Sequence, residues 1–221
     1  MIPVQNLYLK VEDTLAKNQA GNFNNDEFNL ILPMAQDDLM DFFLSLDGSS
    51  QQVHDALNPF IKNYQAAIAD TIALPADYRS KRNARVRLNL EVNGTATFPW
   101  FSCDFMQTDE DFGTLSSPIR GPSIANEQFL YKINSDGISI FPENLTGLFE
   151  MSYVRHPLAA SRAVTYDVPT ETEVYNAGAT VNLEWNSQQF NMFHDIICFY
   201  MSVVIRESEV ITWLQNRGLK R

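Results

Sequence analysis

The sequence of 221 residues is poor in the residue types on which many active sites depend. It contains only three histidines, two cysteines and nine glycines. No two histidines stand at the spacing of metal ligands, and the pattern Cys-x-x-Cys is absent. Two cysteines are too few for a disulfide scaffold. So few glycines leave few positions where the backbone can approach a phosphate group closely. The composition therefore gives no support to a metal site, a disulfide scaffold or a phosphate-binding loop.

Motifs of the common catalytic sites are missing as well. The sequence has no Gly-x-Ser-x-Gly, no P-loop and no dinucleotide-binding glycine pattern. Asp111-Phe112-Gly113 matches the metal-binding tripeptide of protein kinases, but neither a glycine-rich loop nor His-Arg-Asp precedes it. The acidic pairs Asp37-Asp38 and Asp109-Glu110 fall on stretches that we predict to be solvated surface. We therefore assign no catalytic residue, no cofactor and no metal ligand.

No hydrophobic run is long enough to span a membrane. The longest, Ile196 to Ile205, has ten residues and includes Ser202, whereas a bilayer span requires about 20. We also find no secretory signal in the first ten residues, because no basic region precedes a long apolar stretch there. The run belongs to a longer segment, Asn186 to Ile205, that is apolar on nearly all sides in its second half. Such a segment predicts a buried core helix of a soluble domain.

This core helix organises the expected fold. Asn186 or Ser187 is its predicted N-cap, and Cys198 is expected to act within it as a small hydrophobic residue. His194-Asp195 lies on the same helix, where a satisfied structural pair is a simpler interpretation than a site. The residues at steps of three and four that are predicted to face the core are Phe193, Ile197, Tyr200 and Val204. A short second helix is expected at Glu209–Asn216, ending before Gly218.

The first part of the chain predicts three helices. Val4 to Lys17 is amphipathic, with Leu7, Val11 and Leu15 on one face. Asn24 and Glu27 are spaced as a capping box for a second helix, in which Pro33 predicts a kink or a lead-in turn. Its predicted inner face consists of Phe28, Ile31, Ala35, Leu39, Phe42 and Leu46. Gln51 to Leu57 is predicted as a third helix. Residues 60–78 fit a helix in their first part and extended chain in their second.

The middle of the chain changes to a period of two, which is typical of strands. Apolar and polar residues alternate over Ala84–Val92, Asn93-Gly94 is a strong two-residue turn signal, and Thr95–Phe101 returns as the partner strand. Pro99 predicts that this partner lies at an edge or ends there. Three further strands are expected at residues 129–133, 138–142 and 148–155, as an antiparallel meander, and a fourth at residues 180–185.

These elements predict an α+β fold, because helices come first, strands follow and helices return. We expect a single domain over residues 1–221, with a helical part at about 1–78 and 186–221. An antiparallel β-rich part is inserted at about 84–185. The terminal helices are expected to pack on the buried C-terminal core helix.

The net charge of −11 argues against a dedicated nucleic-acid-binding protein, which would carry a basic excess. The positive charge is nevertheless concentrated in two places, a central cluster and a C-terminal tail. These candidate interface residues are Arg79, Lys81, Arg82, Arg85 and Arg87 in the cluster, and Arg217, Lys220 and Arg221 in the tail. Arg85 and Arg87 are expected to share the open face of the hairpin. Two interpretations remain open, namely solvated surface and a docking contact.

The order of several segments along the chain resembles a known group of proteins. The segments are N-N-D-E-F-N-L-I-L-P-M-A-Q-D-D-L, I-A-L-P-A-D-Y, S-P-I-R-G-P-S, I-S-I-F-P-E with F-E-M-S-Y-V-R-H-P, and V-N-L-E-W with I-I-C-F-Y-M-S-V-V-I-R-E-S-E-V-I-T-W. Over nearly its whole length the chain is similar to head-to-tail neck proteins in the virions of crAss-like and related Bacteroidota tailed phages. The similarity lies in apolar and turn positions rather than in a catalytic motif.

This resemblance implies a structural protein rather than an enzyme. It implies a homo-oligomeric ring of twelve copies that connects the portal to the tail, with phage DNA passing through the lumen. The expected partners are further copies of the chain, the portal protein and neighbouring neck or tail proteins, with no membrane. The expected location is the virion neck, assembled in the host cytoplasm. No functional residue is carried over. The alternatives are a small hydrolase that uses surface carboxylates and a tail-fibre or scaffold-binding module.

Overall fold

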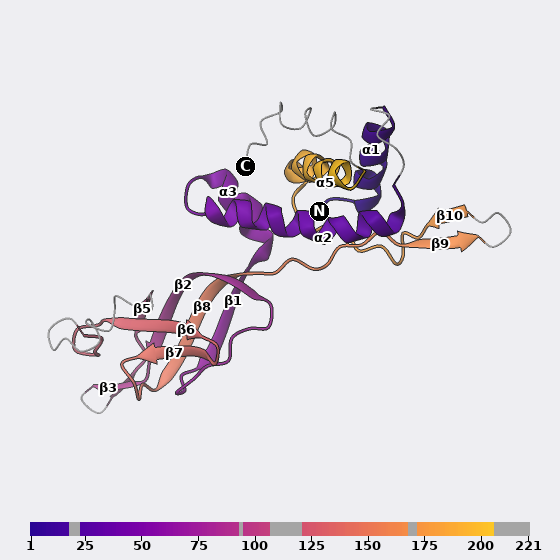
Figure 1. The fold of residues 1–221 in the computed structure, drawn as a ribbon. Coiled ribbons are helices and arrows are strands. Elements are labelled where there is room, and N and C mark those ends of the chain that lie inside the picture. Colours follow the sequence, from indigo (N-terminus) through magenta and orange to yellow (C-terminus); the bar gives the residue numbers. More distant parts are fainter. Residues whose placement is uncertain (18–22, 93–94, 107–120, 168–171, 206–221) are drawn as a thin grey trace. The chain divides into compact units, whose positions relative to one another are not determined.

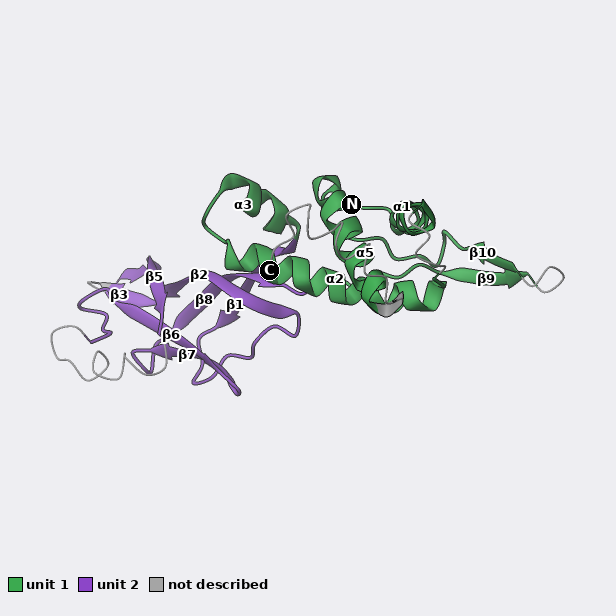
Figure 2. Ribbon diagram, turned by 45° about the horizontal axis from the view of Figure 1, so that its top comes forward, with its two compact units in different colours: residues 1–59, 157–221 green, residues 60–156 purple. Residues whose placement is uncertain are grey.

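The computed structural model describes residues 1–17, 23–92, 95–106, 121–167 and 172–205 (Figure 1). The fold is α+β, as predicted. It divides into two compact units, which Figure 2 colours separately. The helical unit comprises Met1–Pro59 and Pro157–Arg221, and the sheet unit is Phe60–His156. The inserted part thus begins and ends earlier than the predicted bounds of 84 and 185.

Four helices of the described chain lie in the helical unit. They are α1 (Val4–Lys17), α2 (Asn25–Ser45), α3 (Gln51–Leu57) and α5 (Phe190–Ile205). The predicted capping box begins α2, since the Asn24 side chain accepts from the backbone N–H of Glu27 and the Glu27 carboxylate accepts from that of Asn24. The helix α2 then runs continuously through Pro33. Local sequence signals therefore set the start of this helix.

The inner face of α2 differs from the prediction at its C-terminal end. Phe28, Ile31, Ala35 and Leu39 are buried as expected, but Phe42 and Leu46 are exposed. Phe43 is buried instead, with its ring centroid 5.7 Å from that of Trp185. Successive helical residues point about 100° apart, so Phe42 and Phe43 cannot both face the same partner. The partner comes from residue 185, which the local period cannot reveal.

Helix α5 is the centre of this unit, as predicted, and α1 and α2 pack against it. Phe193 and Ile197 are completely buried, and Tyr200 is half-buried with its hydroxyl donating to Asp38 of α2. The side chain of Val204 lies outside the described residues, as does the helix expected at 209–216. Asn186 is the N-cap of a 3-10 turn at Ser187–Gln189 that leads into α5, but the predicted capping bond from its side chain is absent. Its Nδ2 donates instead to the backbone carbonyl of Asp55.

The strand predicted at residues 180–185 is also wrong. Val181 and Leu183 make only isolated bridges, to Ser161 and to Ile2 respectively. A hairpin that the sequence did not predict lies just before this segment. It consists of β9 (Val164–Asp167) and β10 (Thr172–Tyr175), paired antiparallel.

The sheet unit contains one six-stranded sheet and a small two-stranded sheet. The large sheet has the order β1-β8-β2-β5-β6-β7, and β3 pairs with β4 in the small one. Its strands are β1 (Ile61–Ala67), β2 (Tyr78–Leu88), β5 (Trp100–Phe105), β6 (Phe129–Asn134), β7 (Gly137–Phe141) and β8 (Gly147–Arg155). The small sheet pairs β3 (Leu90–Val92) with β4 (Thr95–Thr97). Only β5 and β6 run parallel among these neighbours.

The predicted hairpin is confirmed in its pairing and its register. Val92 pairs with Thr95, which leaves two residues between them, and the same register continues to Arg87 opposite Trp100. The turn residues Asn93 and Gly94 lie outside the described part of the chain. The strand breaks at Pro99, which follows β4 and precedes β5, as the missing N–H of proline predicts.

The predicted meander is wrong, although its three strands exist. β6 and β7 form a hairpin, but β8 does not pair with β7. Strand β8 lies between β1 and β2 instead, so that Glu150 stands opposite Gln65 of β1 and opposite Arg85 of β2. Alternation of apolar residues shows that a segment is a strand and which face is inward, but it does not identify the neighbouring strand. The helix that fitted the first part of residues 60–78 is also wrong, because Ile61–Ala67 forms strand β1.

The large sheet is curved so that its apolar face lies inside. Strands β6 and β7 cross β8 in Figure 1, and the rings of Tyr131 on β6 and Phe149 on β8 lie 5.7 Å apart although β2 and β5 separate their strands. The curve is closed further at its β7 edge, where Ile138 and Ile72 exchange two backbone hydrogen bonds of 2.8 and 2.9 Å. The interior is filled by buried hydrophobic side chains of both halves of the sheet.

Gly147 permits the close approach of β8 to β2, and its replacement tests this packing. A Cβ atom at this position would lie 2.0 Å from the carbonyl oxygen of Arg87, and the φ angle of +154° disfavours side chains. We expect Gly147→Ala to destabilise the protein by at least about 1–3 kcal/mol from backbone strain alone. Gly178→Ala is the control, because its Cβ would meet only ordinary contacts. Urea denaturation measures both, and equal midpoints for the two variants would contradict this packing.

Candidate interaction surface

The outer face of the sheet unit is polar and is built mainly by β1, β8, β2 and β5. Along β2 the side chains of Ala84, Val86 and Leu88 are buried, whereas Arg85 and Arg87 alternate with them on the other face. The sheet registers place the following residues on the outer face with these arginines: Asn63, Gln65, Asn83, Trp100, Ser102, Leu148, Glu150 and Ser152. The expectation that Arg85 and Arg87 share the open face is met.

Trp100 is the aromatic centre of this face. Its ring centroid lies 4.4 Å from the guanidinium carbon of Arg85 and 5.5 Å from that of Arg87. The Trp100 residue is 38% exposed, so part of its surface remains accessible beside the two cations. The Nε atom of Arg87 is buried without a hydrogen-bond partner among the described residues. We call Phe98, Trp100, Arg85 and Arg87 the aromatic–arginine patch, and we include Phe98 because it stands two residues before Trp100 in the chain and is largely exposed.

An ion pair borders this patch. Arg85 donates to Glu150 on the neighbouring strand over 2.8 Å, and the exposed fractions of the two side chains are 53% and 20%. Such an exposed pair contributes about 0–1 kcal/mol. Asn63, Ser152 and Asn83 form a cross-strand row beside it, and the short Ser152 side chain leaves a polar hollow of about 290 Å³. The patch and the hollow together give this face both apolar and hydrogen-bonding groups.

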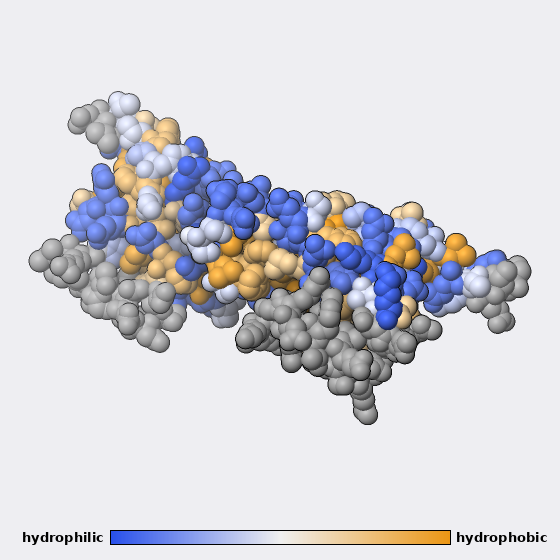
Figure 3. Space-filling model, turned by 90° about the horizontal axis from the view of Figure 1, so that it is seen from above, coloured by the Kyte–Doolittle hydropathy of each residue, from blue (hydrophilic) through white to orange (hydrophobic). Residues whose placement is uncertain are grey.

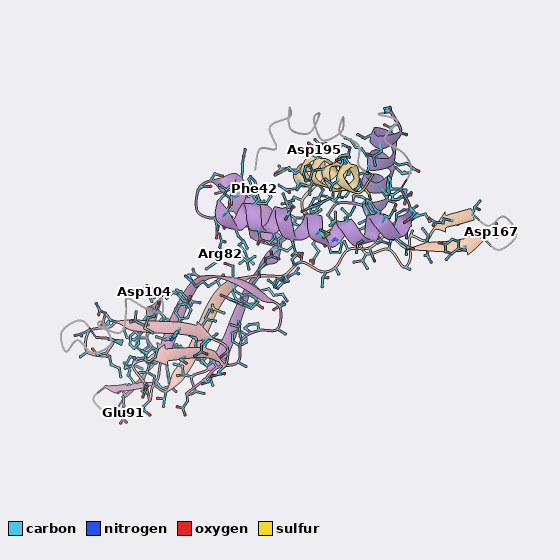
Figure 4. The ribbon with its side chains drawn as sticks, viewed as in Figure 1. Phe42, Arg82, Glu91, Asp104, Asp167 and Asp195 are labelled. Atoms are coloured by element: carbon cyan, nitrogen blue, oxygen red, sulfur yellow. The ribbon has the colours of Figure 1, made fainter. Side chains whose placement is uncertain are left out.

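The remaining residues of the predicted basic cluster are spread over the strand rather than gathered in one place. Lys81 lies on the opposite face, where its Nζ is 3.8 Å from the centroid of the Phe105 ring. The Nη1 atom of Arg79 lies 3.3 Å from Nδ1 of His156. Arg82 is half-buried at the irregularity between Lys81 and Asn83, and Figure 4 labels its place on β2. Arg217, Lys220 and Arg221 lie outside the described residues.

The sequence prediction missed Trp100 and Phe98 as members of this surface. A usable signal was present, because a two-residue turn at Asn93-Gly94 fixes a register in which Arg87 faces Trp100. Cross-strand neighbours on one face lie close enough for an arginine to stack on an indole ring. The predicted partner strand already included Trp100, so working out which residue stands opposite Arg87 would have located the centre of the patch.

A second group of side chains that could take part in a reaction lies on α5, where a histidine, an aspartate and a cysteine meet. His194 has its Nδ1 2.9 Å from a carboxylate oxygen of Asp195 and its Nε2 2.9 Å from the Thr14 hydroxyl. The Sγ atom of Cys198 lies 3.5 Å from the same Nε2. The arrangement resembles a nucleophile, a base and an orienting acid. However, Cys198 is completely buried, and burial raises the pKa of its thiol to about 12.

The Cys198 side chain is therefore a protonated thiol near neutral pH and not the thiolate that acts as a nucleophile. Its reactivity can be tested. Burial also raises the pKa of Cys103 to about 12. Because the pKa of each thiol is higher in the folded than in the unfolded protein, the unfolded protein loses the proton first as the pH rises. The contribution of the protonated thiols to the free energy of unfolding is therefore complete below about pH 9 and is lost as the pH rises toward 12. We expect neither thiol to react with a soluble disulfide reagent at pH 8 until the protein is unfolded, when both should react. Rapid labelling of one thiol in the folded protein would reopen the enzymatic interpretation.

No protein-family model matches this chain, and no similar protein was found among curated proteins. The use of the outer face must therefore be argued from its own chemistry.

No group of three or more His, Cys, Asp or Glu side chains that could hold a metal ion is found within the described ranges. In the same part of the chain, no helix has both the length and the hydrophobicity required to span a bilayer.

Proposed function

We propose that this protein is a non-enzymatic structural protein of a phage virion, which forms a ring between the portal and the tail. The aromatic–arginine patch is the observation that carries the proposal. Tryptophan and arginine are the residue types most enriched at the centres of protein interfaces. The patch offers both on an outer sheet face, which suits a contact with another protein surface.

The distribution of charge supports assembly from identical copies. The described residues of the helical unit contain three lysines or arginines and thirteen acidic residues, whereas those of the sheet unit contain eight of each. Strand β2 alone carries five basic residues and no acidic one. Two unlike surfaces on one chain favour head-to-tail contacts, which close into a ring if the rotation between copies permits it.

An acidic ring would also suit the passage of DNA. Phosphates bind tightly to proteins that present many lysines and arginines, and an acidic lumen repels them instead. In this proposal DNA passes through the lumen without being held. The ring has twelve copies, its other partners are the portal and neighbouring neck or tail proteins, and it is assembled in the host cytoplasm before it resides in the virion. The resemblance in sequence supports these details.

Negative-stain imaging of the purified protein, with and without its portal, tests the proposal. We expect closed rings of the protein alone or a ring seated on the portal. A small oligomer that never forms rings and does not bind the portal would overturn it. A monomer that binds a tail fibre or a scaffold protein but no portal would support the binding-module alternative instead.

A further inference from the structure

The hairpin of β9 and β10 is an extension of the helical unit that its own unit leaves largely uncovered. Figures 1 and 2 both show it projecting away from helices α1 and α2. Six of its eight residues are exposed, and only Val164 and Tyr175 at its base are half-buried. An isolated two-stranded hairpin is at best marginally stable in water. A hairpin of this kind is expected to gain order when another surface covers it.

The exposed side chains of the hairpin combine apolar and acidic groups. Figure 3 shows hydrophobic and hydrophilic residues side by side at this end of the helical unit. Tyr166 and Val174 are 66% and 49% exposed. Tyr166 pairs with Glu173 across the two strands, and its hydroxyl donates to the Glu173 carboxylate over 3.1 Å. Asp167 lies next to Tyr166 at the end of β9, where Figure 4 shows it far from the helices of this unit. Successive strand residues point to opposite faces, so the hairpin presents the Tyr166 ring beside the Glu173 carboxylate on one face, and Asp167 with Val174 on the other.

The aromatic–arginine patch of the sheet unit has the opposite charge and similar hydrophobic content. It offers Trp100 and Phe98 for apolar contact with Tyr166, and it offers Arg85 and Arg87 as partners for Glu173 on the same face of the hairpin. Carboxylates bind arginine through short, directional hydrogen bonds. The Arg85 side chain is 53% exposed, so a second carboxylate can approach its guanidinium group while Glu150 keeps its own contact.

We infer that the hairpin of one copy docks on the aromatic–arginine patch of a second copy. This inference rests on the proposed ring, and it identifies the two surfaces that join successive copies. The contact is heterologous, because the hairpin and the patch are different surfaces of the same chain. The carboxylates of the hairpin argue against nucleic acid as its occupant, since phosphates would be repelled.

Charge exchange tests this contact. Asp167→Arg with Glu173→Arg places like charges against the patch, and Arg85→Glu with Arg87→Glu does the same from the other side. We expect each double variant to raise the concentration needed for half-assembly at least about tenfold, and the combined quadruple variant to recover most of that loss. Asp13→Arg with Asp55→Arg is the matched control, because both carboxylates are exposed elsewhere on the helical unit and the change in charge is the same.

Cysteine cross-linking then establishes which chains are in contact. The native cysteines Cys103 and Cys198 are buried, so introduced thiols are the reactive ones. Tyr166→Cys protein mixed with Phe98→Cys protein should give a disulfide-linked dimer under oxidation, whereas Leu30→Cys mixed with Phe98→Cys should not. If the wild-type protein forms rings, the charge-exchange variants assemble equally well and the cysteine variants do not cross-link, the docking inference is overturned but the proposed ring is not. A wild-type chain that never assembles would overturn both.

Discussion

Phe193→Ala is expected to lower the melting temperature by roughly 6–20 °C. The Phe193 side chain is completely buried, and its ring packs edge-on against Trp185 at a centroid separation of 5.6 Å. Truncation of a buried phenylalanine costs about 3–5 kcal/mol, because it removes apolar contacts and leaves a cavity. Each kcal/mol corresponds to about 2–4 °C in a protein of this size. Thermal unfolding followed by circular dichroism measures the effect.

Phe42→Ala provides a control of the same chemical type. Phe42 is 48% exposed on α2, so its truncation removes less buried area and leaves no closed cavity. We expect its melting temperature to fall by much less than that of Phe193→Ala. A shift below about one degree for Phe193→Ala would mean that α5 is not the core of the helical unit. Equal shifts for both variants would contradict the burial that distinguishes the two residues.

The second large effect concerns assembly rather than folding. Reversing Arg82, Arg85 and Arg87 to glutamate is expected to leave the circular dichroism spectrum unchanged and to weaken ring or portal assembly by about tenfold or more. The Arg85→Glu change sets a carboxylate opposite that of Glu150 and removes an exposed pair worth about 0–1 kcal/mol. The loss should be greatest at low salt, because charges are screened over about 10 Å at 0.1 M and about 3 Å at 1 M.

The triple lysine variant at the same positions separates charge from shape. It keeps the positive charge but loses the planar guanidinium groups that stack on Trp100. We expect it to assemble better than the glutamate variant and less well than the wild type. Sedimentation across a salt series compares the three proteins. If all three sediment alike at every salt concentration, the arginines only solvate the sheet, and the docking interpretation loses its support.

The elements of the fold could be predicted from the sequence where local signals decide them. The capping box at Asn24 and Glu27 set the start of α2, and the two-residue turn at Asn93-Gly94 set the register that reaches Trp100. Both depend on residues within a few positions of each other. For the same reason, apolar periodicity located α5 and the burial of Phe193 and Ile197.

Long-range partners explain what the sequence did not reveal. The position of β8 between β1 and β2 depends on pairing with residues that are far away in the sequence, and the choice of Phe43 over Phe42 depends on Trp185. The basic cluster was visible as composition, and regular alternation would place Lys81 on the same face as Arg85 and Arg87. The register shift between Lys81 and Asn83 turns Lys81 to the opposite face, and the sequence gives no signal for that irregularity. The hairpin of β9 and β10 has too few apolar residues to give a clear strand pattern.

Sedimentation velocity of the wild-type protein over a range of concentrations at low salt tests the central claim most directly. We expect a single large species, of roughly 300 kDa if twelve copies of the 25.2 kDa chain close into a ring. That species should dissociate as the salt concentration rises, because the proposed contact joins acidic and basic surfaces. A chain that sediments as a monomer or dimer at every concentration, and does so equally at low and high salt, would contradict the proposed ring.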